Sequence, residues 1–131
     1  MEISQKVTNK ALSKKIWDLG WRLEAEFYWI YDVPGYKHPL LRYKSIIKEF
    51  SNCLLTPAYL PCELGEILPS YIWSRDKRGV SCLEINKSDK EGKIIWTVSY
   101  NFREDLLISD NLANALAEMV IELTEQGRIK P

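Results

Sequence analysis

Two glutamates, Glu24 and Glu26, are the first place where the sequence suggests chemistry. They stand two residues apart in the segment WRLEAEFYWIYD, residues 21–32. A side-chain period of two places both on one face of a β-strand, where the strand rise brings their carboxylates to within roughly 6–7 Å. Paired carboxylates at this distance suit acid–base catalysis or a hard metal ion. The same spacing is typical of the solvent-facing side of an ordinary strand, and we favour that interpretation.

His38 is the single histidine, and it lies in the loop-forming segment VPGYKHP, residues 33–39. A serine or cysteine nucleophile with a histidine base would have to use it. No residue pattern places a nucleophile beside it, so we interpret His38 as an exposed loop side chain. The sequence also contains no phosphate-loop, dinucleotide-binding, nucleophile-elbow or zinc-protease motif. We therefore assign no catalytic residue; a non-enzyme is favoured, although the sequence does not decide the question.

The chain has three cysteines, Cys53, Cys62 and Cys82, and no C-x-x-C pair. A zinc site with four protein ligands would need all three together with His38, at spacings unlike those of common zinc sites. Three cysteines also cannot all pair within one chain. We therefore predict buried free thiols in a reducing compartment, and neither a metal ion nor another cofactor.

Aromatic side chains are the one excess in the composition, with five tryptophans and seven tyrosines. The rings expected to fill the core are Trp29, Tyr31, Trp73, Trp96 and Tyr100. Burial is harder to arrange for Tyr28, Tyr36, Tyr59 and Tyr71, and of these we consider Tyr28 and Tyr36 for a binding surface. Exposed rings are typical of binding surfaces. Trp73 is followed by a cationic cluster that could bind a phosphate or a nucleobase. The predicted binding residues are Tyr28, Tyr36, His38, Trp73, Arg75, Lys77 and Arg78.

The composition fits a single globular domain that covers residues 1–131. Basic and acidic residues balance, 18 of each, so the formal net charge is zero. Neutrality argues against a nonspecific nucleic-acid binder, yet it leaves open a local basic face and a nucleic-acid partner for that face. It also removes one barrier to self-association.

The N-terminal segment, MEISQKVTNKALSKK, has no apolar run and does not show the pattern of a signal peptide. No stretch approaches the roughly 20 apolar residues of a membrane span. We therefore expect a cytoplasmic protein without a membrane partner.

The N-terminal part is predicted to form a helix that runs into a strand. Residues 5–19 carry apolar side chains every three or four positions. Ser4 or Thr8 would cap this helix, and Gly20 would end it in a left-handed conformation. Residues 21–32 alternate as a strand, with three large rings on one face that we expect to be dry and shielded by the two terminal helices.

The middle of the chain is predicted to supply further strands and one short helix. Residues 40–50 suit an amphipathic strand that folds back on the preceding one, although strand and helix remain alternatives here. Residues 51–61 are expected to be irregular. A short helix then opens at Pro57 or Pro61, since proline is accepted at the first helical position, and stops at Pro69.

A hairpin and a final helix complete the predicted elements. The predicted bounds are 80–87 and 93–102 for the strands, 88–92 for their turn and 110–126 for the helix. Ser109 or Asp110 would cap the helix, and Gly127 would follow its end. Together the elements predict an α+β fold: an antiparallel sheet of about four strands packed against the N- and C-terminal helices in a two-layer single domain.

Three segments give the chain a resemblance to small uncharacterised proteins encoded by bacteriophages and prophages. They are the opening ALSKKIWDLGWRLEAEFYWIYD, the central ELGEILPSYI and the closing NLANALAEMVIELTEQGRIKP. Those proteins tend to show a helix running into an aromatic strand, a short helix ending in Leu-Pro, and a final alanine-rich helix ending in glycine. The resemblance implies a host cell's cytoplasm and no known activity, and its motifs carry no catalytic residue.

The leading functional hypothesis is a non-enzymatic accessory protein of phage type that binds a protein partner or itself, with a homodimer as one form. The alternative is a ligand- or nucleic-acid-binding domain that uses Arg75, Lys77 and Arg78 with nearby rings. A hydrolase-type enzyme that uses Glu24 and Glu26 is the third and least favoured hypothesis.

Overall fold

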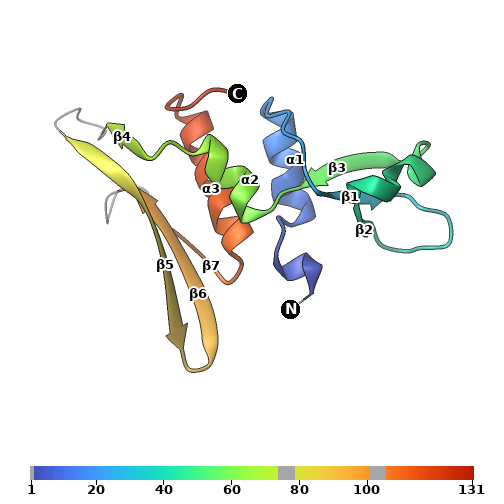
Figure 1. Ribbon diagram of the computed structural model, residues 1–131, viewed down its shortest axis with the longest axis horizontal. Helices are drawn as coiled ribbons and strands as arrows, with labels where there is room; N and C mark the ends of the chain where they lie inside the picture. The colour runs from blue at the N-terminus through green and yellow to red at the C-terminus, as the bar shows by residue number, and fades with distance from the viewer. Residues whose placement is uncertain (1, 74–78, 101–105) are drawn as a thin grey trace.

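The computed structural model of the protein describes residues 2–73, 79–100 and 106–131 and has an α+β architecture with two antiparallel sheets (Figure 1). The N-terminal half contains, in order, η1 (a 3₁₀-helix, Ile3–Gln5), α1 (Lys10–Asp18), β1 (Phe27–Tyr31), β2 (Leu40–Tyr43), η2 (Lys44–Phe50) and β3 (Leu54–Ala58). The C-terminal half contains α2 (Pro61–Ile67), β4 (Tyr71–Trp73), β5 (Val80–Lys90), β6 (Lys93–Tyr100), β7 (Leu106–Ser109) and α3 (Leu112–Glu125).

The helices lie between the two sheets (Figure 1). One sheet has the strand order β2-β1-β3, and the other has the order β4-β5-β6-β7. Helix α3 packs against β6, β7 and α2, while α1 packs against α3 and β3. The predicted α+β class and the two terminal helices are confirmed. The expectation of one sheet of about four strands missed the second sheet, because β1 pairs with β2 and β3 rather than with the later hairpin.

Helix α1 begins at Lys10, later than predicted, and Asn9 caps it. The Leu12 backbone N–H donates to Asn9 Oδ1 at 2.9 Å, so the predicted caps Ser4 and Thr8 were wrong. Thr8 does not serve as a cap because its side chain is buried in a different set of bonds. Gly20 ends the helix with a φ of +104°, as predicted.

Thr8 ties the start of α1 to both neighbouring strands of the first sheet. Its backbone N–H donates to the Tyr59 carbonyl, and its hydroxyl oxygen accepts from the Tyr59 N–H, both at 3.0 Å. The same hydroxyl lies 2.6 Å from that of Ser13, which is also fully buried. The Thr8 carbonyl accepts a hydrogen bond from Trp29 Nε1 at 3.0 Å. This cluster places the N-terminal segment over the ring of Trp29.

The strand predicted over 21–32 is paired only from Phe27 to Tyr31. Residues 21–26 have no strand partner, yet Trp21 and Ala25 are buried on the side that the alternation assigned to the core. Trp21 Nε1 donates to Thr124 Oγ1 in α3 at 3.0 Å, which fixes this segment against the C-terminal helix. Ile30, assigned to the opposite side, is fully buried as well, so β1 is covered on both faces at this point.

Residues 40–50 contain both of the alternatives that the sequence left open. Residues 40–43 form β2, which hairpins onto β1 as predicted, and residues 44–50 form the 3₁₀-helix η2. The register places Arg42 opposite Tyr28 rather than opposite a glutamate. The rings of Phe27 and Tyr43 meet across this pair of strands with their centroids 4.5 Å apart.

Residues 51–61 include β3 and are not irregular, which corrects the prediction. Pro57 is accommodated because β3 is an edge strand, where a missing N–H need not break a ladder bond. Of the two helix openings that were considered, Pro61 is the one used, at the first position of α2. The Glu63 carboxylate accepts from the Leu60 N–H at 2.7 Å and from the Glu26 N–H at 2.9 Å.

The hairpin of β5 and β6 is longer than predicted because its turn is shorter. Lys90 pairs with Lys93, which leaves only Glu91 and Gly92 in the turn. Both have positive φ, +53° and +82°, as a type I′ turn requires. The turn was expected to take five residues, and β7 was not predicted at all.

Helix α3 is buried on most of its sides because it lies between the four-stranded sheet and the other helices. Its cap is Asn111, whose Oδ1 accepts from the Asn114 N–H, so Ser109 and Asp110 were wrong as caps. Gly127 follows the helix with a φ of +72°, as predicted. The buried residues of α3 are Ala113, Ala115, Leu116, Ala117, Met119, Val120, Ile121 and Leu123.

Candidate protein-binding surface

The structure does not bring the predicted binding residues together. Tyr36 and His38 are exposed in the loop between β1 and β2, at one end of the long axis of the molecule, and Trp73 lies at the other end (Figure 1). Tyr28 is half-buried and packs against the main core. The cationic residues predicted with Trp73 lie outside the described residues; they are Arg75, Lys77 and Arg78.

The structure also shows where the residues considered for catalysis or metal binding lie. Glu24 and Glu26 are exposed, and they precede β1 instead of sharing a strand face, so the strand-rise argument for paired carboxylates fails. Within the described ranges, no group of three or more histidine, cysteine, aspartate or glutamate side chains could hold a metal ion. The cysteines are free; Cys53 is half-buried, whereas Cys62 and Cys82 are exposed, which corrects the prediction of buried thiols.

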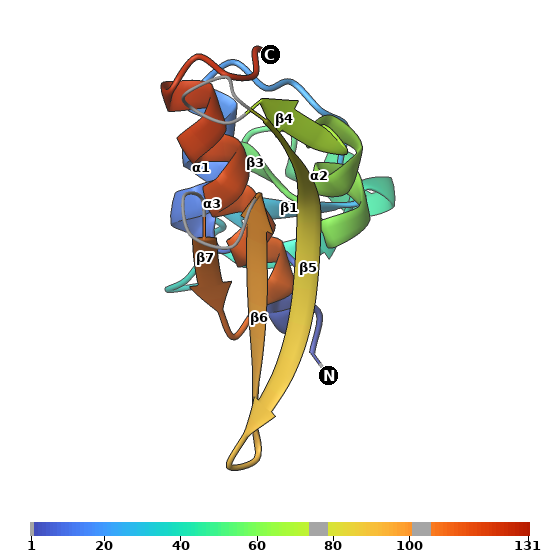
Figure 2. The same cartoon turned by 90° about the vertical axis from the view of Figure 1, so that its left-hand side faces the viewer.

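Exposed apolar side chains lie at two places on the four-stranded sheet, both on the face turned away from α3. Residues that are directly opposite in an antiparallel pair lie on the same face, so the register fixes its membership. We call this surface the outer face, and Figure 2 views the sheet with its strands in front of α3. Strand β4 flanks β5 at residues 80–82, whereas β6 and β7 lie beside the later part of β5. Along β5 from residue 80 to 86 and at the paired positions, the outer face consists of Tyr71, Trp73, Val80, Cys82, Glu84, Asn86, Thr97, Ser99, Leu106 and Ile108.

Large apolar side chains on the outer face are exposed to solvent. They are Tyr71 and Trp73 of β4, Val80 of β5, and Leu106 and Ile108 of β7, with exposed fractions from 44% to 61%. The opposite face holds Ile72, Val98 and Tyr100, which are buried against the helices. An antiparallel sheet with one covered face normally shows polar residues on the other. The outer face departs from that rule.

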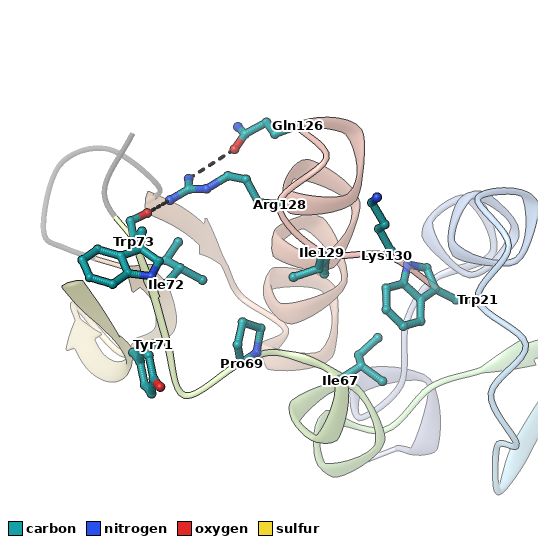
Figure 3. Close-up of a pocket in the computed structure, with 10 residues that line it drawn as sticks. All are labelled: Trp21, Ile67, Pro69, Tyr71, Ile72, Trp73, Gln126, Arg128, Ile129 and Lys130. Atoms are coloured by element: carbon teal, nitrogen blue, oxygen red, sulfur yellow. Dashed lines mark hydrogen bonds between the residues drawn. The ribbon is translucent and has the colours of Figure 1, made fainter. Parts of the chain in front are cut away.

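A cleft of about 840 Å³ adjoins the outer face at the β4 edge (Figure 3). It is lined by β4 together with Trp21, Ile67, Pro69, Gln126, Arg128, Ile129 and Lys130. Arg128 and Lys130 are the charged side chains among its described lining residues.

Hydrogen bonds fix the position of β4 beside the cleft. The Leu83 N–H donates to the Ser70 carbonyl at 2.8 Å. Hydrogen-bonded and non-hydrogen-bonded pairs alternate along an antiparallel ladder, so the backbone N–H and C=O groups of Tyr71 and Trp73 point away from β5. The Trp73 carbonyl accepts from Arg128 Nη2 at 2.6 Å, and Arg128 Nη1 donates to Gln126 Oε1 at 3.3 Å (Figure 3). The C-terminal segment is thereby tied to the outer edge of β4.

Tyr100 supports the turn that leads into β4. Its hydroxyl donates to the Pro69 carbonyl, and its ring is buried in the main core. Burial raises the pKa of the Tyr100 hydroxyl above its ordinary value, so this hydroxyl remains a donor through neutral pH. The polypeptide therefore enters β4 in a fixed position, with Tyr71 and Trp73 turned outward.

Sequence reasoning found Trp73 but missed most of the outer face. Leu106 and Ile108 alternate with Leu107 and Ser109, which is a strand pattern, but the short run was not recognised. Even if β7 had been predicted as a strand, the sequence would not have shown which of its two faces is exposed. Only the pairing of β7 with β6 shows that Leu107 faces α3 and that Ile108 faces outward.

Comparisons with known proteins give no relative: no family model, no curated protein and no solved structure matches the chain. The resemblance to phage-encoded proteins therefore stays a prediction. Among the described residues, no helix combines the length and the apolar content that a membrane crossing requires.

Proposed function

We propose that the protein is a non-enzymatic accessory protein, of the phage type that its sequence resembles, and that it acts by protein–protein contact through the outer face. The observation that supports this most is that Trp73, Tyr71 and Ile108, each about 60% exposed, all lie on the outer face. Tryptophan and tyrosine are the residues that most often dominate binding energy at interfaces. Tyr71, Trp73 and Val80 are neighbours on this face, and monomeric proteins seldom leave such a cluster of large apolar side chains exposed without a binding role.

The energetics indicate that the whole face must take part. Tyr71 and Trp73 together still expose on the order of 200–300 Å². Covering that area would contribute roughly 5–8 kcal/mol before costs. Association itself costs an estimated 4–15 kcal/mol. The two rings alone therefore leave little surplus, and the aliphatic residues of β5 and β7 must be buried in the same contact.

A photo-crosslinking experiment tests this function. A photoreactive amino acid is placed at position 108, and the protein is irradiated in the organism that encodes it and, separately, in purified form. We expect a discrete protein adduct, either to another protein or to a second copy. The matched control is position 36, which is 57% exposed but lies in the loop at the opposite end of the molecule. Equal labelling at the two positions, or none at position 108, would contradict the proposal.

A second candidate function, ligand or nucleic-acid binding, is supported by the cleft beside β4. Its volume of about 840 Å³ lies within the usual range for ligand sites, and its lining combines rings with the cationic residues Arg128 and Lys130. Aromatic and basic side chains together are typical of single-strand binding. A labelled single-stranded oligonucleotide is the probe: binding that weakens steeply with salt and on Lys130→Ala would support this function. Binding that changes neither with salt concentration nor on Lys130→Ala would exclude this site.

A further inference from the structure

We infer that the open edge of β4 accepts an extended segment of a partner protein, which pairs with β4 as a fifth strand and places an acidic side chain beside Lys130. This contact uses the edge of the sheet and the cleft, not the outer face. It therefore goes beyond the proposed function and does not depend on it. Three features support it: the backbone groups at the edge of β4, the cleft beside them and the charge of the cleft lining.

The outer edge of β4 presents backbone groups that β5 does not use. Tyr71 and Trp73 form the non-hydrogen-bonded pairs with β5, so their N–H and carbonyl groups point away from it. Arg128 donates to the Trp73 carbonyl. Within the described part of the chain, the Tyr71 N–H, the Tyr71 carbonyl and the Trp73 N–H make no hydrogen bond. Two donors and one acceptor thus stand at the two-residue spacing that another extended backbone matches.

The cleft lies along this edge and has room for one extended segment. Figure 3 shows β4 on one side of it and Trp21 with Lys130 on the opposite side. Its volume of about 840 Å³ suits a drug-sized ligand, and three extended residues span only about 10 Å. A helix about 10 Å across has its backbone groups bonded internally, so it would leave the edge of β4 unpaired.

Apolar contacts are provided on both faces of an added strand. Its residues opposite Tyr71 and Trp73 would share the outer face with those two rings, whereas a residue opposite Ile72 would turn to the other face. Ile67 and Ile129 add half-buried apolar lining to the cleft. Aromatic and β-branched residues make favourable cross-strand pairs with exposed rings. We therefore expect the bound segment to carry such residues at alternate positions.

The charge of the cleft favours an acidic side chain in the bound segment. The described lining contains two cations, Arg128 and Lys130, and no carboxylate side chain. Arg128 already donates to the Trp73 carbonyl and to Gln126. Lys130 is exposed, and no acidic side chain in the described ranges forms an ion pair with it. A glutamate or aspartate of the partner would pair with Lys130, while a lysine in the same place would be repelled.

A single-stranded nucleic acid matches these features less well. Its phosphates would meet two cations in the described lining, and one of them, Arg128, is engaged with the backbone of β4. A sugar–phosphate backbone also lacks the regular alternation of N–H and carbonyl groups that pairs with a strand. The zero net charge of the chain gives no general attraction for a polyanion. An extended acidic peptide therefore fits this edge better.

Selection of peptides on the purified full chain tests the inference. The probe is a display library of random heptapeptides, and the most enriched sequences are synthesised with acetylated and amidated ends, so that no terminal carboxylate contributes. We expect these peptides to combine an acidic residue with β-branched or aromatic residues. In fluorescence anisotropy, Lys130→Glu should weaken their binding roughly tenfold or more and improve that of matched peptides with lysine in place of the acidic residue. Lys90→Glu, beside the turn between β5 and β6, is the control and should change neither.

Methylation of the peptide nitrogens tests strand pairing on the unaltered protein. Each backbone N–H of a selected peptide is replaced in turn by N–CH₃. We expect losses of roughly fivefold or more at alternate positions, because a paired strand turns every second N–H toward its neighbour.

A proline in β4 tests the same pairing from the side of the protein. Tyr71→Pro removes the N–H at the open edge and spares the ladder with β5, because that N–H points away from β5. Tyr71→Ala is the matched control, since it also removes the ring but keeps the N–H. The proline variant should bind the selected peptides roughly fivefold more weakly than the alanine variant. Circular dichroism checks the fold of both.

The possible failures are distinct. A library without binders, or a methylation scan without alternation, would overturn the inference. A single-stranded oligonucleotide that binds in a Lys130-dependent way and displaces no peptide would overturn it in favour of nucleic acid. A dimer in sedimentation equilibrium that Tyr71→Pro disrupts would overturn it in favour of a second copy at this edge. The proposed function is tested separately, by the crosslink at position 108 on β7, which is the opposite edge of the sheet.

Discussion

Trp29 in β1 and Trp73 in β4 make the most informative comparison in the molecule. Both belong to short strands rich in aromatic residues, and both sit in antiparallel sheets that cover helices. Trp29 is half-buried; its Nε1 donates to the Thr8 carbonyl, and Lys10 Nζ lies 5.9 Å from its ring centroid. Trp73 is 61% exposed.

The difference comes from what the chain places beside each ring. The segment before α1 passes across Trp29 and satisfies its indole N–H, whereas the side chain of Trp73 stays largely exposed on the outer face. One aromatic strand is therefore part of the core, and the other presents its rings on the surface that we propose for protein binding. The aromatic content of a strand therefore does not decide whether its rings are buried or exposed. What decides it is whether another segment of the chain packs over them.

The largest expected effect separates the two tryptophans directly. Trp29→Ala should lower the free energy of unfolding by about 2–3 kcal/mol, because it removes half-buried ring packing and leaves the Thr8 carbonyl without its donor. Trp73→Ala should change the stability of the monomer by less than about 0.5 kcal/mol. Urea denaturation, at a protein concentration where both variants are monomeric, measures the two free energies of unfolding. Similar losses for both would mean that Trp73 is covered within one chain.

The next effect tests the cover over Trp29. Thr8→Val keeps the shape of the side chain but removes the hydroxyl that bonds the Tyr59 N–H and the Ser13 hydroxyl, both of which are buried. We expect a loss of about 1–3 kcal/mol from the unsatisfied groups. Thr8→Ser retains the hydroxyl and is the matched control, so it should lose clearly less. Equal losses would show that the methyl group, not the bonds, holds this segment in place.

A smaller effect concerns the turn that sets the register of the outer face. Gly92 has a φ of +82° in the two-residue turn, and an alanine there should cost about 1 kcal/mol from backbone strain. Gly65 in α2 provides the control, since no atom lies within 4 Å of an added Cβ and its φ is not positive. Gly65→Ala should therefore stabilise the protein by about 0.5–1 kcal/mol. Thermal denaturation of both variants, with opposite shifts expected, measures the difference.

The smallest effect is a pH dependence in the core helix. Burial, together with the neighbouring charge of Glu122, raises the pKa of Glu118 in the folded state. The folded protein then holds this proton more tightly than the unfolded chain, so Glu118 lowers stability as the pH rises above its unfolded-state pKa of about 4.3. Glu118→Gln should stabilise the protein by less than about 0.5 kcal/mol at neutral pH and have no effect well below pH 4. A gain that persists in acid would have another cause.

Sequence reasoning succeeded where the cause is local. The alternation of burial from Trp21 to Phe27, the apolar edge of α2 at Leu64, and the positive-φ glycines Gly20 and Gly127 follow from neighbours in the chain, and all four agree with the structure. It was less reliable for the residues that cap the helix N-termini. Asn9 and Asn111 are the caps of α1 and α3, although Thr8 and Ser109 are residue types equally suited to capping. Those choices depend on which polar group tertiary contacts require elsewhere.

The candidate surface could be predicted only in part, because its membership depends on distant pairing. Trp73 attracted notice by its type and its basic neighbours. Leu106 and Ile108 join it only through β6, which sets their faces. Tyr28 was expected at the surface, yet it packs on the core because β1 is the central strand of a sheet that the sequence did not reveal.

Fluorine NMR on the protein labelled with 5-fluorotryptophan tests the central claim most directly. The five tryptophan signals are assigned by single substitutions to phenylalanine, and the solvent isotope shift of each is followed across a dilution series. We predict that Trp73 shows a large isotope shift at the lowest concentration, where the chain is monomeric, while Trp29 shows a small shift at every concentration. A Trp73 signal that is shielded at the lowest concentration, or a Trp29 signal as exposed as that of Trp73, would contradict the account.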